Sequence, residues 1–355
     1  MWARVYHNRS GKSSIIGDRY SDVESPLFVL ILSNTEVANI PGISGAGSSE
    51  ALLQHTPAAD AEVVTCGALQ TIDALPDSLS GAATPSVLTR AALNLTKIPC
   101  LLINSGLKVA PGVPYYDLKA EWGKDIQRGP AVKDSQHIYA SSKKLAKLLN
   151  CDLAIIGETI PGGTTTALAV LRALGYDSSV SSSFSKNPIE LKEQVVRKAL
   201  AQSPITLNRL KREPLKAVEL FGDPMMPCAA GLVEELTKTG SSVMLAGGSQ
   251  MAAVFAILKE LSVSGDITLA TTKYVFDDES ACFIDLVKKL QIDAFGSYPD
   301  FRTSKFNQLK AYELGEVKEG VGAGGAMVAT AMKGFTNNDF RNEVERVLIG
   351  FNTCF

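Results

Sequence analysis

Residues 153–166 read LAIIGETIPGGTTT. Four apolar residues at 153–156 lead into a turn rich in glycine and threonine, and the helical pattern TTTALAVLRAL follows at 164–174, directly before Gly175. A short apolar run, a glycine-bearing loop and a helical pattern in succession indicate a strand followed by a helix. We therefore predict a βα unit, with its strand at 153–156 and its helix at 164–174.

The same succession recurs along the chain. Further strands are predicted at 27–32, 62–65, 100–103, 243–245 and 267–270, and further helices at 189–201 and 250–261. These strands are apolar throughout, as parallel strands covered on both faces are, whereas half-exposed antiparallel strands alternate polar and apolar residues. The sequence thus predicts an α/β protein with a doubly wound, mostly parallel, Rossmann-like sheet that carries helices on both faces.

The length of the chain favours one large domain. Its 355 residues suit either two domains or one large α/β domain, and no repeat of 20–50 residues is evident. We assign residues 26–333 to a large α/β domain. The polar residues 1–25 and the segment 334–355 look less like sheet material, so we expect them to pack together as a small terminal subdomain or a dimer contact.

Composition excludes several classes of function. Lys and Arg number 35 against 37 Asp and Glu, so no basic field exists to hold nucleic acid or an anionic membrane. No apolar run reaches the roughly 20 residues that cross a bilayer, and none has the length of a signal peptide. The six cysteines form no CxxC pair and the three histidines are dispersed, so we predict neither a disulfide framework nor a metal site. We expect a soluble, cytoplasmic protein that binds small molecules.

Two glycine turns are candidate anion sites, because ligands of an open parallel sheet bind beyond the carboxyl ends of its strands. Gly162 and Gly163 precede a helix start whose free N–H groups attract anions; alternatively, the following threonines simply cap that helix. Gly247 and Gly248 repeat the arrangement, and two such turns at one edge of the sheet predict a split anion site. The alternative is that these glycines only allow close packing of a strand against a helix. Glu158 lies at a strand end, where substrates bind.

A third glycine-rich loop, EVKEGVGAGGA at 316–326, places Glu319 directly before its glycines. A carboxylate in a narrow site can act as a general base, whereas the alternative is a surface glutamate ahead of a flexible hinge. The turn GDPMMP holds Asp223, whose role is ambiguous, and two methionines. Met225 and Met226 either wall an aromatic ligand or form a turn beside the core.

Several of these segments, taken in order, resemble one family. The segments are GETIPGGTTTALAVL, SSSFSKNPIELKEQVVRKAL, FGDPMMPCAAGL, LAGGSQMAAV and VKEGVGAGGA, with IPGISGAG and TPAADAE nearer the front. They resemble nicotinate-nucleotide:dimethylbenzimidazole phosphoribosyltransferase, in its archaeal and cyanobacterial-type branch. The resemblance runs from about residue 27 to residue 329 and so covers most of the chain.

The resemblance implies a function. The family is a homodimeric pentosyltransferase that works without a cofactor. It transfers phosphoribose from nicotinate mononucleotide to a lower-ligand base, such as dimethylbenzimidazole, adenine or similar, for cobamide biosynthesis. It gives nicotinate and an α-riboside 5′-phosphate. By resemblance, Glu319 matches the catalytic carboxylate. The substrate-binding positions are expected at Glu158, Gly162, Gly163, Thr164, Thr165, Lys192, Asp223, Gly247, Gly248, Gly320 and Gly322.

Two other functions compete with this hypothesis. A non-catalytic nucleotide-binding or regulatory protein on the same fold would keep the phosphate turns, although retention of Glu319 argues against it. A nicotinamide-dependent oxidoreductase would need an intact GxGxxG after a strand and an acidic residue about 20 positions onward, and neither is clear.

Overall fold

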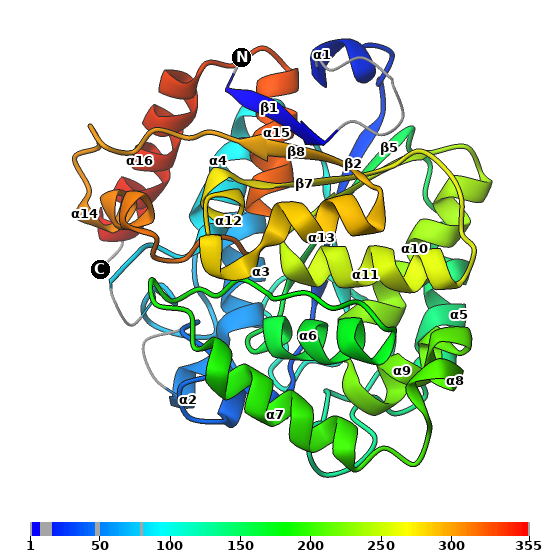
Figure 1. Ribbon diagram of the computed structural model, residues 1–355. Helices are drawn as coiled ribbons and strands as arrows, with labels where there is room; N and C mark the ends of the chain where they lie inside the picture. Colours follow the sequence, from blue (N-terminus) through cyan, green and yellow to red (C-terminus); the bar gives the residue numbers. More distant parts are fainter. Residues whose placement is uncertain (1, 8–15, 47–49, 79–80, 354–355) are drawn as a thin grey trace.

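An eight-stranded sheet forms the centre of the computed structural model, which describes residues 2–7, 16–46, 50–78 and 81–353 (Figure 1). Gly47 of IPGISGAG and residues 1, 8–15 and 354–355 of the predicted terminal subdomain lie outside the described residues. The strand order is β1-β8-β7-β6-β5-β2-β3-β4. The strands are β1 (Ala3–His7), β2 (Pro26–Leu32), β3 (Cys100–Asn104), β4 (Tyr116–Asp117), β5 (Leu153–Thr159), β6 (Ser242–Ala246), β7 (Ile267–Thr272) and β8 (Asp293–Ser297).

The sheet is parallel except for its edge strand β1, which pairs antiparallel with β8. From β2 the chain adds β3 and β4 on one side and later β5 to β8 on the other. The order of the strands therefore reverses between β2 and β5. The carboxyl edge at such a reversal is where open α/β sheets bind their ligands.

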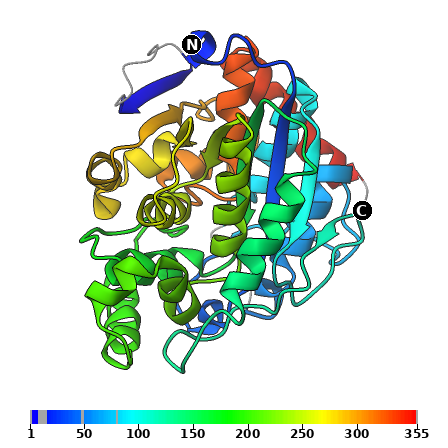
Figure 2. The same ribbon diagram turned by 90° about the vertical axis from the view of Figure 1, so that its right-hand side faces the viewer.

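Helices cover both faces of the sheet (Figure 2), and the two faces of β2 show why. Val29 and Ile31 join one hydrophobic cluster, while Phe28, Leu30 and Leu32 join the other. A strand that is apolar on both faces needs cover on both, so the predicted doubly wound sheet is confirmed. No helix in the described part of the chain is long and apolar enough to cross a membrane.

The helices divide between the two clusters. The Phe28 side is covered by α3 (Thr56–Cys66), α4 (Pro85–Thr96), α15 (Ala323–Met332) and α16 (Asn337–Thr353). The Val29 side is covered by α5 (Ser135–Ala146), α6 (Gly163–Ala173), α7 (Ile189–Ala201), α9 (Pro214–Phe221), α10 (Met225–Lys238), α11 (Ser249–Glu260) and α13 (Phe283–Leu290). Shorter turns are α1 (Ile16–Arg19), α2 (Glu50–Leu53), α8 (Leu207–Arg212), α12 (Lys273–Phe276), α14 (Asn307–Lys310), η1 (Glu36–Asn39), η2 (Glu279–Ala281) and η3 (Ala311–Leu314).

Five of the six predicted strands are confirmed, and the one at 62–65 is wrong. Those residues lie in α3, which has Pro57 in its first turn and ends at Gly67 in the left-handed conformation. Val63 and Val64 are buried. A short apolar run fits a buried helix as well as a buried strand, so the pattern alone could not separate the two. Strands β1, β4 and β8 were not predicted.

The two ends of the chain meet on the Phe28 side. Trp2 stacks on Phe340 of α16 with ring centroids 5.2 Å apart, and the Trp2 indole Nε1–H donates to the carbonyl of Phe335 at 2.8 Å. Residues 3–7 also form a strand, which corrects the expectation that the N-terminal residues are unlike sheet material. That these ends form a separate subdomain or a dimer contact stays a prediction.

Three glycines let the start of α15 lie directly against the sheet. A Cβ on Gly322 would come within 3.0 Å of Gly157 Cα on β5, and a Cβ on Gly325 within 2.4 Å of the Ala246 Cβ on β6. A Cβ on Gly324 would lie 2.3 Å from Thr271 Cα on β7. The chain before α15 is thereby brought against three neighbouring strands near their carboxyl ends.

Replacement of Gly322 by alanine tests this packing. We expect Gly322→Ala to lower the free energy of unfolding by about 3 kcal/mol, because its φ of +66° is unfavourable with a Cβ and because the new methyl group meets Gly157 and Phe28. Gly334→Ala is the matched control at the far end of α15, with φ of +85° and nothing within 4 Å of its Cβ. It should cost about 1 kcal/mol, from backbone strain alone. Equal losses in denaturant titrations would contradict close packing at Gly322.

Candidate functional site

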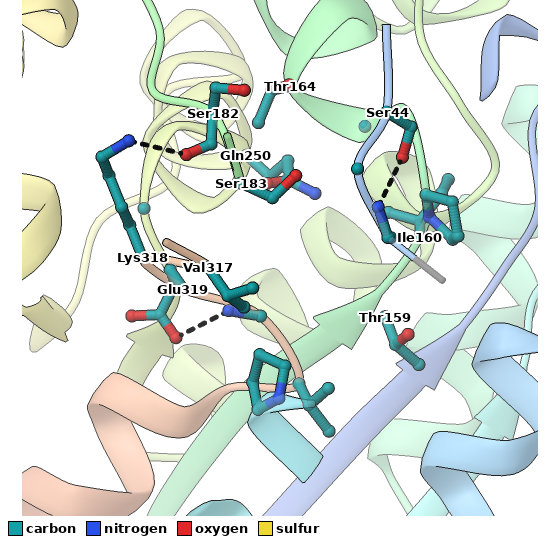
Figure 3. Close-up of a pocket in the computed structure, with 18 of the residues that line it drawn as sticks. Ser44, Thr159, Ile160, Thr164, Ser182, Ser183, Gln250, Val317, Lys318 and Glu319 are labelled. Atoms are coloured by element: carbon teal, nitrogen blue, oxygen red, sulfur yellow. Dashed lines mark hydrogen bonds between the residues drawn. The ribbon is translucent and has the colours of Figure 1, made fainter. Parts of the chain in front are cut away.

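A cavity of about 890 Å³, counting its open mouth, lies beyond the carboxyl ends of β2, β5, β6 and β7 (Figure 3). It lies where the order of the strands reverses, which is where open α/β sheets bind their ligands. The lining comprises Ile43, Ser44, Gly45, Ala46, Thr56, Asp60, Pro76, Ser78, Thr84, Pro85, Glu158, Thr159, Ile160, Pro161, Gly162, Gly163, Thr164, Ser181, Ser182, Ser183, Gly248, Ser249, Gln250, Val275, Val317, Lys318, Glu319, Gly320 and Val321.

Two helix starts meet at one side of the cavity. Gly162, in the left-handed conformation, precedes α6, and Gly248 precedes α11. The two starts are neighbours, since a Cβ on Gly163 would lie 2.5 Å from Nε2 of Gln250. At α6 the N–H groups of Gly163 and Thr165 already donate to the carbonyls of Ile160 and Gly162, at 3.1 and 3.0 Å. The positive ends of the two helix dipoles lie on the same side of the cavity, and this favours an anion there.

A serine-rich stretch borders the same side and was not singled out as a site from the sequence. Residues 181–184, which we call the serine segment, line the cavity with their three serines. The N–H of Ser181 donates to Ser249 Oγ at 2.9 Å, which joins the segment to the start of α11. The signal in the sequence is the run SSSFS, which lies within one of the segments that carry the family resemblance.

Glu319 is held by four donors. Its Oε2 accepts from Thr271 Oγ1 at 2.6 Å and from the Thr272 N–H at 3.1 Å, at the end of β7. Its Oε1 accepts from the N–H groups of Gly320 and Gly324 at 3.1 and 3.0 Å. Burial raises the pKa of Glu319 above its ordinary value, while these hydrogen bonds oppose the rise. The result is a carboxylate fixed in orientation at the cavity wall.

Two more carboxyl groups line the cavity. Glu158, at the end of β5, is 2% exposed, and burial together with the nearby Asp223, Glu319 and Asp60 raises its pKa well above the usual range. Burial therefore favours the protonated form of this side chain.

The third carboxyl group, Asp60 on α3, was not proposed from the sequence, although TPAADAE contains it. It accepts from the hydroxyls of Thr84 and Thr159, both at 2.8 Å. Burial raises the pKa of Asp60 to about 6. Its neighbours come from α4 and β5, so only the tertiary fold shows that it belongs to the cavity.

The structure brings together seven of the predicted site residues and places five elsewhere. The cavity lining includes Glu158, Gly162, Gly163, Thr164, Gly248, Glu319 and Gly320. Lys192 is buried and its Nζ donates to the carbonyl of Ser181 at 2.8 Å, so it contacts the serine segment rather than the cavity. The others outside the lining are Thr165, Asp223, Gly247 and Gly322.

The GDPMMP turn lies in the core rather than at the cavity. Met225 and Met226 are fully buried at the start of α10, on the Val29 side of the sheet. The carboxylate of Asp223 accepts from Thr166 Oγ1 at 2.6 Å and from the Met225 N–H at 3.1 Å. Among the residues described, no three His, Cys, Asp or Glu side chains are grouped so that they could hold a metal ion.

Two solved structures, both from Thermus thermophilus, share this architecture. Nicotinate-nucleotide-dimethylbenzimidazole phosphoribosyltransferase matches with a TM-score of 0.60 and 15% identity, over 94% of this chain and 86% of that chain. A structure described as CobT matches with a TM-score of 0.58, also at 15% identity, over 94% and 87% of the two chains. The chain therefore has the fold of this class of proteins, and the predicted resemblance is confirmed at the level of the fold.

Sequence relatives define the family itself. The UPF0284 protein of Methanosarcina acetivorans is 47% identical over 329 residues, which are 91% of this chain and 94% of the relative. UPF0284 protein TK0853 of Thermococcus kodakarensis is 42% identical over 325 residues, 90% and 96% of the two chains. No family model matches the chain. The chain belongs to the UPF0284 family.

The pH dependence of the free energy of unfolding tests the burial of Asp223. Burial raises its pKa from 3.8 to about 6, so between these pH values the folded state binds more protons than the unfolded state, and stability falls as pH rises. Asp223→Asn removes this dependence. The stability of the variant relative to the wild type should therefore rise by about 2 kcal/mol from pH 4 to pH 6.5 and then level off. A difference that does not vary with pH in denaturant titrations would contradict the assigned burial.

Proposed function

We propose that this protein transfers phosphoribose from nicotinate mononucleotide to a lower-ligand base. The products are nicotinate and an α-riboside 5′-phosphate for cobamide biosynthesis. One observation carries the proposal: Glu319 and the two glycine-preceded helix starts line the same cavity. A proton acceptor and an anion site in one cavity are what this transfer requires. The likeness of the fold to phosphoribosyltransferase structures supports the proposal.

The anion site takes the phosphate of the nucleotide. Gly162 and Gly163 allow a phosphate to approach the positive end of the α6 dipole, and Gly248 does the same at α11. The hydroxyl groups of Ser182 and Ser183 add further donors, whereas the Ser181 hydroxyl donates to Asp278. The carboxyl groups of Glu158, Asp60 and Glu319 repel a dianion when they are ionised, so the phosphate is placed away from them.

Chemistry takes place at C1′ of the ribose. Displacement of nicotinate passes through an oxocarbenium-like state that needs little covalent help and much positioning of the nucleophile and the leaving group. Glu319 takes the proton from one ring nitrogen of the base as the other nitrogen attacks, and burial makes it a stronger base than an exposed glutamate. Attack opposite the departing pyridine inverts C1′ and converts a β nucleotide into an α riboside.

The other carboxyl groups suit binding roles. Burial raises the pKa of Glu158, and in its protonated form this side chain donates a hydrogen bond to a ribose hydroxyl or another acceptor of the nucleotide. Asp60 offers a hydrogen-bond acceptor near Pro85 and Gly320, on the side of the cavity where we place the base; a Cβ on Gly320 would lie 3.2 Å from Pro85. A benzimidazole or purine base fits this mixed wall. The protein is proposed to act in the cytoplasm as a homodimer.

Glu319→Gln tests the role of the base. The amide keeps the shape of the side chain but cannot accept a proton, so base-dependent release of nicotinate from nicotinate mononucleotide should fall about 100-fold or more. Nucleotide affinity, measured by calorimetry, should change little. Glu279→Gln is the matched control, because this glutamate is exposed and lies outside the cavity, and it should leave turnover unchanged.

Other outcomes would separate the hypotheses. Nucleotide binding without nicotinate release for any of a panel of benzimidazole and purine bases would favour a non-catalytic binding protein. Full activity in Glu319→Gln would contradict the assignment of the proton acceptor while leaving the transfer reaction intact.

A further inference from the structure

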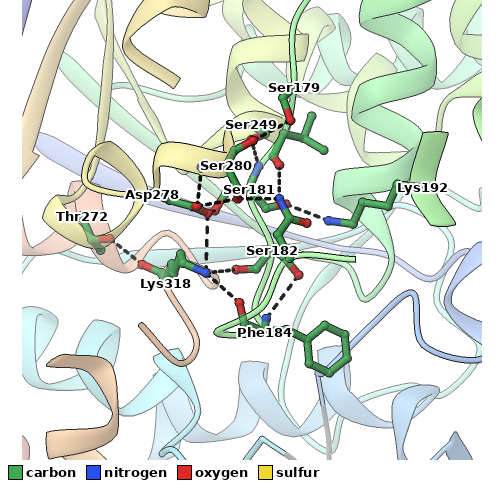
Figure 4. A network of polar contacts seen from close by, with 12 residues as sticks. Ser179, Ser181, Ser182, Phe184, Lys192, Ser249, Thr272, Asp278, Ser280 and Lys318 are labelled. Atoms are coloured by element: carbon green, nitrogen blue, oxygen red, sulfur yellow. Dashed lines mark hydrogen bonds and ion pairs between the residues drawn. The ribbon is translucent and has the colours of Figure 1, made fainter. Parts of the chain in front are cut away.

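Lys318 is the one cationic side chain among the described residues that line the cavity, and it is 5% exposed. Its Nζ donates to the carbonyls of Phe184 and Ser182, at 2.7 and 3.2 Å, and lies 3.5 Å from a carboxylate oxygen of Asp278 (Figure 4). A lysine ammonium has three donors. All three are directed at protein groups, so Lys318 acts on the serine segment rather than directly on a substrate.

The main chain of the same residues runs beside the serine segment. The N–H of Val317 donates to the carbonyl of Ser183 at 2.9 Å, between the two carbonyls that Lys318 binds. The carbonyl of Lys318 accepts from Thr272 Oγ1, and the N–H of Thr272 donates to Glu319. Residues 317–319 are therefore fixed to the serine segment on one side and to the end of β7 on the other.

A second buried lysine, Lys192, binds the other end of the segment. Lys192 donates to the carbonyl of Ser181, and the two lysines reach the segment from different sides (Figure 4). Asp278 accepts from Ser181 Oγ at 2.9 Å and so ties the same residue to Lys318. Three successive backbone positions, 181, 182 and 183, thus have their carbonyls bound by donors, and none of these oxygens is left to face an anion.

We propose that Lys318 is a positioning residue that fixes the distance between the serine segment and Glu319. On the function proposed above, one end of this link binds the nucleotide phosphate and the other removes the proton from the base. Hydrogen bonds from a buried ammonium are stronger than neutral ones, and a misplacement of about 1 Å between reacting groups can cost about 100-fold in rate. Loss of the ammonium should therefore release both elements together.

Amide hydrogen exchange on the ligand-free protein tests the link without relying on any activity. In Lys318→Met, peptides spanning 178–187 and 314–322 should exchange about tenfold faster or more, while peptides of β2, β3 and α4 stay unchanged. The matched control is Lys143→Met, which breaks a part-buried ion pair with Glu234 between α5 and α10. It should leave both peptides as in the wild type. Unchanged exchange at 178–187 in Lys318→Met would overturn the proposal.

The KM values for the two substrates distinguish a positioning role of Lys318 from a general loss of structure. Lys318→Met should raise the KM for nicotinate mononucleotide about tenfold and lower kcat, with the KM for the base changing less than about twofold. Equal rises in both KM values would overturn the positioning role. If Lys318→Met does not fold, Asp278→Asn replaces it, since the amide keeps an acceptor for Ser181. This variant should show the same pattern of faster exchange at smaller amplitude. Wild-type exchange in Asp278→Asn would also overturn the proposal. An inactive wild type with the expected exchange pattern would refute the proposed function alone.

Discussion

The geometry of the site depends on the backbone-to-sheet contact made by Gly322, Gly324 and Gly325. Side chains normally separate a helix from a sheet, but here the start of α15 approaches β5, β6 and β7 so closely that a Cβ would overlap each strand. The approach places the N–H of Gly324 against the carboxylate of Glu319, and it brings Thr271 and Thr272 to the other carboxylate oxygen. The three glycines thus hold the Glu319 carboxylate in one orientation, and they do not form a flexible hinge.

The cavity that results has two chemically different sides. Helix starts and serine hydroxyls border one side, while the carboxyl groups of Glu158, Asp60 and Glu319 lie along the β5, α3 and α15 side. Burial raises the pKa of each of these acids, so each is protonated more readily than an exposed acid, and protonation lessens the repulsion of a bound phosphate. A single cavity can therefore accommodate an anion at one side and proton transfer at the other.

Much of the fold could be predicted because parallel strands are apolar on both faces and glycine turns mark their ends. The βα unit at 153–166 is the clearest case. The run EVVT at 62–65 shows the limit, since four residues with two valines do not distinguish a strand from a buried helix. The loop at Glu319 follows no predicted strand, so only the family resemblance placed it at this site. The loops at Gly162 and Gly248 could be predicted to meet because they follow neighbouring strands. Asp60 and Lys318 could not, since their partners are far away in the sequence. Lys192 was assigned to the substrate site, whereas it contacts the serine segment from outside the cavity.

The direction in which a nucleotide lies in the cavity distinguishes the two sides described above. A crystal structure of the protein with nicotinate mononucleotide would measure it. We expect the phosphate at the starts of α6 and α11, with C1′ of the ribose turned towards Glu319. A phosphate beside Glu319, or a nucleotide bound outside this cavity, would contradict it.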